Sequence, residues 1–224
     1  MARVALVTGA RGGIGAAIVA RLEADGWSVH GVDIDDADLT TTSGNRAVVE
    51  AALDAHGRLD ALVPNAGFQH VAPVRDFPEE TWDRLLALLL TSPFLLAKYA
   101  WDALAASGDG RICVIASAHG LAASANKAGY VAAKHGVVGL VKTLALEGAG
   151  VGILATAVCP AFVRTPLADQ QVGERGLDAV IERHAVKRML EPDEVAGFVA
   201  FLLGPGGGGF TGVALPLDLG WTAA

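Results

Sequence analysis

The sequence predicts an α/β fold, a doubly wound parallel seven-stranded sheet with helices on both faces. Three observations predict it. Short apolar runs with many β-branched residues alternate with longer segments in which apolar residues recur at helical spacing. A glycine-rich turn, TGARGGIG at 8–15, separates the first apolar run from the first helical segment. The second apolar run ends at an acid, Asp33, about 20 residues after that turn.

The chain begins with a strand, a helix and a second strand. Residues 3–7 (RVALV) form a short apolar run that is typical of a buried parallel strand. Apolar residues then recur at helical spacing over 14–22, and Gly26 is placed to end that helix. The run SVHGVDI at 28–34 predicts the second strand. The glycine turn therefore lies inside a strand–helix–strand unit.

The segment after the second strand is unusually short. DDADLT at 35–40 leaves no room for a full crossover helix before another strand. We therefore expect Asp38–Leu39 to form a stub of the third strand, at the edge that would face an adenine. A helix is expected to follow from about 45 to 56. Asp35 and Asp36 are interpreted as members of a solvated acidic loop.

The rest of the chain continues the alternation. Apolar runs predict the remaining strands at 59–67, 111–117, 153–160 and 213–218, and helical periodicity predicts the remaining helices at 79–106, 127–148 and 191–203. Pro93 predicts a kink in the longest helix. Residues 162–190 are polar, irregular and rich in charge, which predicts a mobile lid. No repeat or linker divides these elements, so 1–224 is expected to be a single Rossmann domain.

The glycine turn is of the kind that binds the phosphates of a dinucleotide. Glycines let the backbone approach a pyrophosphate, which is held by the N–H groups at the start of the following helix. Asp33 can accept hydrogen bonds from the adenosine ribose diol and would repel a 2′-phosphate, which favours NAD over NADP. Arg11, a cation in the turn, argues the other way, because it could meet that phosphate. We give Asp33 the greater weight.

A second group of residues predicts acid–base chemistry. Tyr130 and Lys134 are spaced i,i+4, so on a helix they lie on one face, one turn apart. A phenol has a pKa of about 10, and an adjacent ammonium favours the phenolate and lowers that pKa. Ser117 ends a predicted strand and could hold an alcohol or carbonyl oxygen beside the phenol. Moving a proton does not oxidise an alcohol, so the site also needs a hydride acceptor, which the predicted dinucleotide would provide.

The composition argues against several other classes. The chain of 224 residues is 52% hydrophobic with a mean hydropathy of +0.43, enough for a large core. Its net charge of −7 argues against a nucleic-acid partner. Cys113 and Cys159 lie in apolar runs and are interpreted as buried thiols, and no metal-ligand spacing occurs. No signal peptide is recognised and the longest apolar run, Leu85–Ala97, is too short to cross a membrane, so a cytoplasmic location is expected.

The glycine turn, the NAG at 65–67 and the trio Ser117, Tyr130 and Lys134 resemble, in order and spacing, the pattern of the short-chain dehydrogenase/reductase family. The resemblance covers essentially the whole chain. Within the family, four segments are similar to the bacterial D-3-hydroxybutyrate dehydrogenases: 66–78, 115–138, 159–167 and 220–223. The resemblance implies an NAD-dependent oxidoreductase that transfers a hydride between nicotinamide and the 3-hydroxyl carbon of a small hydroxy acid, such as 3-hydroxybutyrate. It also implies a homotetramer built on the two long helices.

Roles are carried over from the resemblance position by position. Tyr130 takes the hydroxyl proton, Ser117 orients the oxygen, and Lys134 lowers the phenol pKa and holds the nicotinamide ribose. The implied substrate-binding residues are Gln69, His119, Lys127 and Gln171. The predicted cofactor-binding residues, from the turn and the resemblance together, are Gly9, Arg11, Gly13, Ile14, Gly15, Asp33, Asp38, Leu39, Asn65, Ala66, Gly67, Tyr130, Lys134, Pro160, Val163 and Thr165. Taken singly, the four substrate residues could equally be turn or surface polar groups; together they favour a site for a small anion.

The sequence departs from the family pattern at Leu89, Thr156, Ala161 and Leu219. Leu89 stands where the family usually has an asparagine that completes a water relay to the lysine. Leucine forms no hydrogen bond through its side chain, so either another water path serves Lys134 or turnover is impaired. Two alternatives therefore stay open. One is the same chemistry on a steroid, cyclic alcohol or acyl ketone, and the other is a cofactor-binding protein with weak catalysis.

Overall fold

The computed structural model describes residues 2–223, apart from the side chains at 167, 170, 171, 174 and 175. The strands form one parallel sheet in the order β2-β1-β3-β4-β5-β6. They are β1 (Val4–Thr8), β2 (Ser28–Val32), β3 (Ala61–Val63), β4 (Gly110–Ile115), β5 (Ile153–Pro160) and β6 (Val213–Leu217). In register, Val7 lies beside Gly31 of β2 and Val63 of β3. The predicted doubly wound sheet is confirmed, with six strands in the described part of the chain rather than seven.

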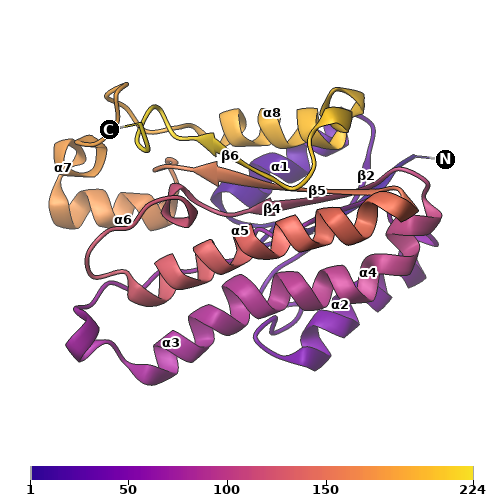
Figure 1. Cartoon of the computed structure of the whole chain (residues 1–224), viewed down its shortest axis with the longest axis horizontal. Coiled ribbons are helices and arrows are strands. Elements are labelled where there is room, and N and C mark those ends of the chain that lie inside the picture. Colours follow the sequence, from indigo (N-terminus) through magenta and orange to yellow (C-terminus); the bar gives the residue numbers. More distant parts are fainter. Residues whose placement is uncertain (1, 224) are drawn as a thin grey trace.

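Helices cover both faces of the sheet (Figure 1). One face carries α1 (Gly13–Ala24) and α8 (Pro192–Leu203), and the other carries α2 (Thr42–His56), α4 (Ser92–Ala106) and α5 (Ala128–Gly148). Two sets of buried apolar side chains fill the space, one on each face. Because the central strands are covered on both sides, their sequences are near-continuous apolar runs.

The prediction of a strand at Asp38–Leu39 is wrong. The chain turns after β2 and enters α2 directly, since a parallel partner for β2 would need a crossover longer than this segment allows. The segment is instead tied to the helices by Asn45, which is fully buried. Its side-chain amide donates to the carbonyls of Leu39 (2.8 Å) and Thr41 (2.7 Å) and accepts from Ser92 Oγ (2.6 Å). β2 is therefore left as an edge of the sheet.

The long helix predicted at 79–106 is interrupted. α3 (Glu79–Leu86) runs into a wider, π-helical turn at Ala87–Thr91, and α4 follows directly. Pro93 has no N–H to donate to the Leu89 carbonyl, so the irregularity falls in the turn just before the proline. By length and composition Glu79–Ala106 could cross a membrane. However, it packs against α2 and α5, as the core helix of a water-soluble fold does.

Residues 162–190 are less irregular than the sequence suggests. They contain α6 (Pro166–Arg175) and α7 (Leu177–Ile181), which lie beyond the carboxyl end of β5 (Figure 1). Thr165 caps α6 by accepting the backbone N–H of Ala168 at 3.3 Å. The C-terminal segment after β6 lies at the same end of the molecule.

Candidate active site

The strand order reverses at β1, whose neighbours are β2 and β3. In open α/β sheets, ligands bind at the carboxyl ends of the strands beside such a reversal. A cavity of about 630 Å³ opens there. The predicted residues that line it are Gly9, Gly13, Ile14, Asp33, Asp38, Leu39, Asn65, Ala66, Gly67, Tyr130, Lys134, Pro160 and Thr165. Thus most of the predicted cofactor residues share one cavity with the tyrosine and the lysine.

The glycine turn is built by close backbone contact. Gly9 has φ +65°, and a Cβ on it would lie 2.9 Å from Ala66 Cα. Gly15 does not line the cavity; a Cβ on it would overlap the Gly9 carbonyl oxygen. Asn65 Nδ2 donates to the carbonyls of Thr8 (2.9 Å) and Gly9 (3.2 Å). The turn therefore presents the start of α1 to the cavity without side chains in the way, which fits a pyrophosphate.

At the end of the cavity beside β2, Asp33 is fixed by two backbone donors. It accepts the N–H of Arg11 at 2.9 Å and that of Ile34 at 2.8 Å. The Arg11 side chain does not line the cavity; its guanidinium donates to both carboxylate oxygens of Asp36, at 2.6 and 2.7 Å, and to Asp35 at 3.4 Å. Asp35 and Asp36 are exposed, in agreement with the interpretation of a solvated acidic loop, and Asp36 in addition pairs with Arg11.

Ser117, Tyr130 and Lys134 come together as predicted. Lys134 is 6% exposed, and its ammonium donates to the Ile115 carbonyl at 2.7 Å and lies 5.6 Å from the centre of the Tyr130 ring. Burial lowers the pKa of Lys134 to about 8. Ser117 follows β4, and its hydroxyl accepts the backbone N–H of His119 at 3.1 Å. The phenol therefore has the Ser117 hydroxyl and the Lys134 ammonium as neighbours.

The lowered pKa that the sequence predicts for Tyr130 is not found in the chain without a bound ligand. Burial raises the pKa of Tyr130, and a hydrogen bond with Ser117 offsets part of that rise. Burial in the same site also raises the free energy of the charged phenolate. This cost outweighs the stabilisation of the phenolate by its neighbours. The phenol is therefore protonated in the unliganded chain at neutral pH.

A second cavity, of about 110 Å³, adjoins the phenol. It is lined by Ile14, Gln69, Ser117, Ala118, His119, Lys127, Tyr130, Ala161, Phe162, Val163, Thr165, Ala168 and Trp221. Three of the four predicted substrate residues, Gln69, His119 and Lys127, therefore line the same cavity. Val163, which was predicted to bind the cofactor, lines this second cavity as well. The side chain of the fourth, Gln171, lies outside the described part of the chain.

Among the described residues that line it, the second cavity combines one cation, Lys127, with neutral polar groups. Lys127 is 4% exposed, and its ammonium lies 5.3 Å from the centre of the Phe162 ring. The pKa of His119 is lowered to about 3, mainly by burial and then by the charge of Lys127, so His119 is neutral at physiological pH. Gln69 Nε2 is buried and has no hydrogen-bond partner among the described residues. A buried donor of this kind is costly unless a ligand accepts from it.

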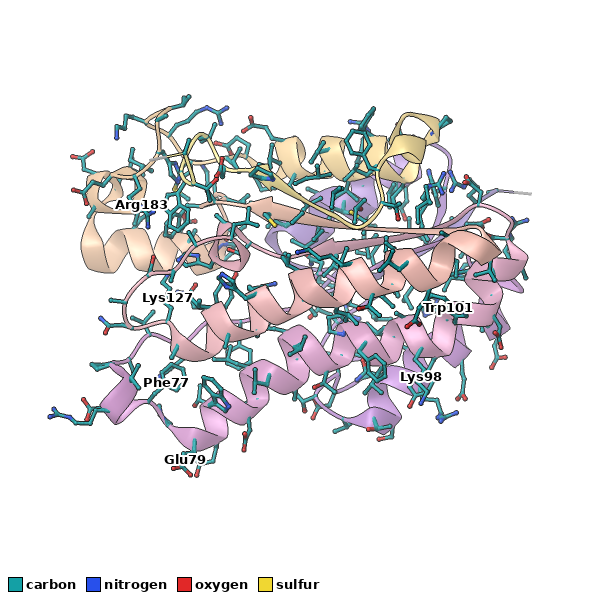
Figure 2. All side chains as sticks on the ribbon, in the orientation of Figure 1. Phe77, Glu79, Lys98, Trp101, Lys127 and Arg183 are labelled. Carbon is teal, nitrogen blue, oxygen red and sulfur yellow. The ribbon has the colours of Figure 1, made fainter. Side chains whose placement is uncertain are left out.

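Sequence reasoning missed residues that close this cavity. The Trp221 ring lies 5.0 Å from the His119 ring, and Arg183 stacks on Trp221 at 4.0 Å. Figure 2 shows Lys127 and Arg183 at the end of the molecule occupied by α6 and α7. Arg84 of α3 was also missed, although it lines the main cavity. A segment near the C-terminus and an exposed arginine on a helix give no local signal of such a role.

Three of the four departures from the family pattern are placed as follows. Ala161 lines both cavities and so lies at their junction. Leu219 has φ +53°, a conformation that favours glycine, and its carbonyl accepts the N–H groups of Ala185 and Val186. Thr156 is buried within β5.

The glycine turn, the acid at the end of β2 and the Tyr130–Lys134 group together define a dinucleotide-binding oxidoreductase. The family model described as enoyl-(acyl carrier protein) reductase matches residues 36–222. The chain is 38% identical to the uncharacterized oxidoreductase YxjF of Bacillus subtilis, over 99% of this chain and 98% of that protein. It is 35% identical to a D-beta-hydroxybutyrate dehydrogenase of Rhizobium meliloti, over 100% of both.

Among solved structures, the chain resembles a 3-ketoacyl-(acyl-carrier-protein) reductase from Brucella melitensis complexed with NADH. The TM-score is 0.91 at 30% identity, over 98% of each chain. This chain therefore belongs to the short-chain dehydrogenase/reductase family, whose members bind a nicotinamide cofactor and act on small molecules.

Replacing Tyr130 with phenylalanine removes the hydroxyl and keeps the ring. We expect Tyr130→Phe to lower kcat for alcohol oxidation about a hundredfold or more, because the proton acceptor is lost, while nucleotide binding is retained. Steady-state kinetics and calorimetric titration with NAD would measure the two effects. Tyr99→Phe, which changes the only other tyrosine, is the matched control. Full turnover in Tyr130→Phe would remove the phenol from the mechanism.

Leu89 is 2% exposed and lies in the π-helical turn. It also lines a small cavity of about 10 Å³, room for about one water molecule, together with Ser92 and Lys134. We expect Leu89→Asn to raise kcat a few-fold by giving this cavity a side-chain donor and acceptor, at some cost in stability. Leu89→Met is the control, since it keeps the site apolar. An unchanged kcat in a folded Leu89→Asn protein would show that protons already reach Lys134 by another route.

Proposed function

We propose that the protein is an NAD-dependent dehydrogenase that transfers a hydride between nicotinamide and the 3-hydroxyl carbon of a small hydroxy acid, with 3-hydroxybutyrate and acetoacetate as the pair. The observation that carries the proposal is the second cavity. It sets a nearly buried cation, Lys127, and an orphan amide donor, Gln69, beside Ser117 and Tyr130. These are the groups that would bind a carboxylate next to the reacting oxygen.

Size and charge favour a small anionic substrate over the alternatives. The second cavity measures about 110 Å³, well below the roughly 300–1,000 Å³ of sites that hold drug-sized ligands. A steroid or long acyl ketone would need the covering residues Phe162 and Trp221 to move. A small cyclic alcohol has no carboxylate to interact with the ammonium of Lys127, which lines this cavity. The similarity to a D-beta-hydroxybutyrate dehydrogenase supports the same choice.

The chain's own residues would carry the proton chemistry. Ser117 would donate to the substrate oxygen and hold it beside Tyr130. Lys134 would stabilise the phenolate form of Tyr130, and that phenolate would accept the hydroxyl proton. When bound, an oxidised nicotinamide would accept the hydride and would add a positive charge to the pocket. The pKa of Lys134, about 8, keeps much of the ammonium charged near neutral pH.

Asp33 supports NAD rather than NADP as the cofactor. Asp33 lines the cavity and is held in place by two backbone N–H donors. A fixed carboxylate can accept from a ribose diol and repels a 2′-phosphate. The glycine turn and the start of α1 would hold the pyrophosphate, and Tyr130 and Lys134 the nicotinamide ribose.

Several wider features of the proposal have partial support. Residues 162–190 would act as the lid, since Phe162 and Ala168 line the second cavity and Arg183 stacks on Trp221. A homotetramer on the long helices is supported by large apolar side chains exposed on α4 and α5, namely Phe94 and Leu146. A cytoplasmic location agrees with the two buried free cysteines.

Lys127 tests the substrate class. We expect Lys127→Met to raise KM for 3-hydroxybutyrate at least about tenfold with a smaller effect on kcat, because the carboxylate loses its cation while the apolar stem is kept. Initial rates of NADH formation with 3-hydroxybutyrate and with 2-butanol, which lacks a carboxylate, would separate charge from packing. Lys142→Met, on the exposed face of α5, the helix that directly follows Lys127, is the control. An unchanged KM for the acid would contradict the proposed substrate.

Asp33 tests the cofactor preference. We expect Asp33→Ala to raise the ratio of kcat/KM with NADP to kcat/KM with NAD about tenfold, because the charge that repels the 2′-phosphate is lost. Asp33→Asn is the matched variant, since it keeps an acceptor for the backbone N–H groups of Arg11 and Ile34. The same ratio in all three proteins would count against a ribose role for Asp33.

A further inference from the structure

The cation of the glycine turn is bound by an acid from the loop after β2. One guanidinium nitrogen of Arg11 donates to both oxygens of Asp36, at 2.6 and 2.7 Å. The Asp36 carboxylate also accepts the backbone N–H of Asp33 at 2.7 Å. In return, the backbone N–H of Arg11 donates to Asp33 at 2.9 Å. These contacts join the glycine turn to the end of β2 in a closed loop of three residues.

The contacts determine where the positive charge lies. Asp33 lines the main cavity, whereas Arg11, which is bonded to it, does not. The pKa of Arg11 is raised, chiefly by its hydrogen bond to Asp36. The pKa of Asp36 is lowered, first by the Asp33 N–H and then by Arg11, so both groups are charged at neutral pH. A guanidinium engaged with a carboxylate in this way has fewer donors left for a phosphate.

We propose that Asp36 is a specificity-determining residue for the cofactor. By holding the Arg11 guanidinium against the loop after β2, it keeps that cation away from a ribose 2′-phosphate and maintains discrimination against NADP. Asp33 repels the phosphate directly, and Asp36 binds the Arg11 side chain that would otherwise attract the phosphate. This inference rests on the proposed function, because it requires a dinucleotide whose adenosine ribose lies near Asp33. The plain alternative is an exposed ion pair without effect on the cofactor.

The test is calorimetric titration of the full-length protein with NAD and with NADP, without substrate. Asp36→Asn removes the charge but keeps the shape and an acceptor for the Asp33 N–H. We expect it to raise the ratio of NADP affinity to NAD affinity about tenfold, because Arg11 becomes free to meet the 2′-phosphate. The double variant Asp36→Asn with Arg11→Gln should return the ratio to that of the wild type. A gain that survives in the double variant would overturn the proposal.

Two single variants act as controls. Asp35→Asn removes the same charge from the same loop but only one contact, at 3.4 Å, so the ratio should change less than about twofold. If Asp35→Asn raised the ratio as much as Asp36→Asn does, net charge alone would explain the effect and the proposal would be contradicted. Arg11→Gln should leave NADP affinity nearly unchanged. A large loss there would show that Arg11 already reaches the phosphate, and this variant decides the matter even if Asp36→Asn folds poorly.

The same titrations separate this inference from the proposed function. A wild-type protein that binds neither nucleotide, or prefers NADP, would contradict the proposed cofactor. A wild-type protein that prefers NAD, with an unchanged ratio in Asp36→Asn, would contradict only the role of Asp36.

Discussion

The close approach of two backbones at the carboxyl ends of β1 and β3 positions everything else in the site. Gly9 and Gly15 leave no space for a Cβ, and Asn65 bonds the turn from the neighbouring strand. This contact fixes the start of α1 over the sheet edge, where its free N–H groups face the main cavity. β4 and α5, from farther along the chain, bring Ser117 and Tyr130 to the same edge. The catalytic geometry therefore depends on packing that only glycine permits.

Burial acts on the reacting groups in two opposed ways. It lowers the pKa of Lys134 and His119, and it raises that of Tyr130. Because His119 is neutral, Lys127 is the cation among the described residues that line the small cavity. The raised pKa of Tyr130, in contrast, makes its phenolate a stronger base but leaves less of the phenol ionised at neutral pH. A site of this kind becomes an efficient proton acceptor when further positive charge enters it with the oxidised cofactor.

The sequence predicted those parts of the site that local spacing determines. The glycine turn, Asp33 and the i,i+4 pair Tyr130 and Lys134 are each read from a short segment, and the structure brings them into one cavity. The strand predicted at Asp38–Leu39 was wrong, because a two-residue stub carries no information about whether the edge of a partner strand can be reached. The sign of the Tyr130 pKa was wrong because spacing reveals a neighbouring charge but not the depth of burial.

Contacts between distant segments were missed for a related reason. Arg11 and Asp36 are 25 residues apart, and Trp221 is about a hundred residues from His119, so neither pair has a periodicity to detect. Each pair depends on where the fold places two loops. Residues that shape a cavity without supplying its chemistry, such as Phe162 and Trp221, are therefore the hardest to predict from sequence.

The short connection after β2 links these points. Without a further strand, the ribose end of the cavity is built from a loop, and loops are held by side chains rather than by a ladder of backbone hydrogen bonds. Asn45 joins this loop to α2 and α4 by hydrogen bonds, and Arg11 joins the loop to the glycine turn through Asp36. An ion pair that would be incidental on a strand-bound surface thus helps to hold the segment from which Asp33, Ile34 and Asp38 line the cavity. Under the proposed cofactor role, the charge near the ribose would be set by side-chain pairs, which single substitutions can alter without disturbing the sheet.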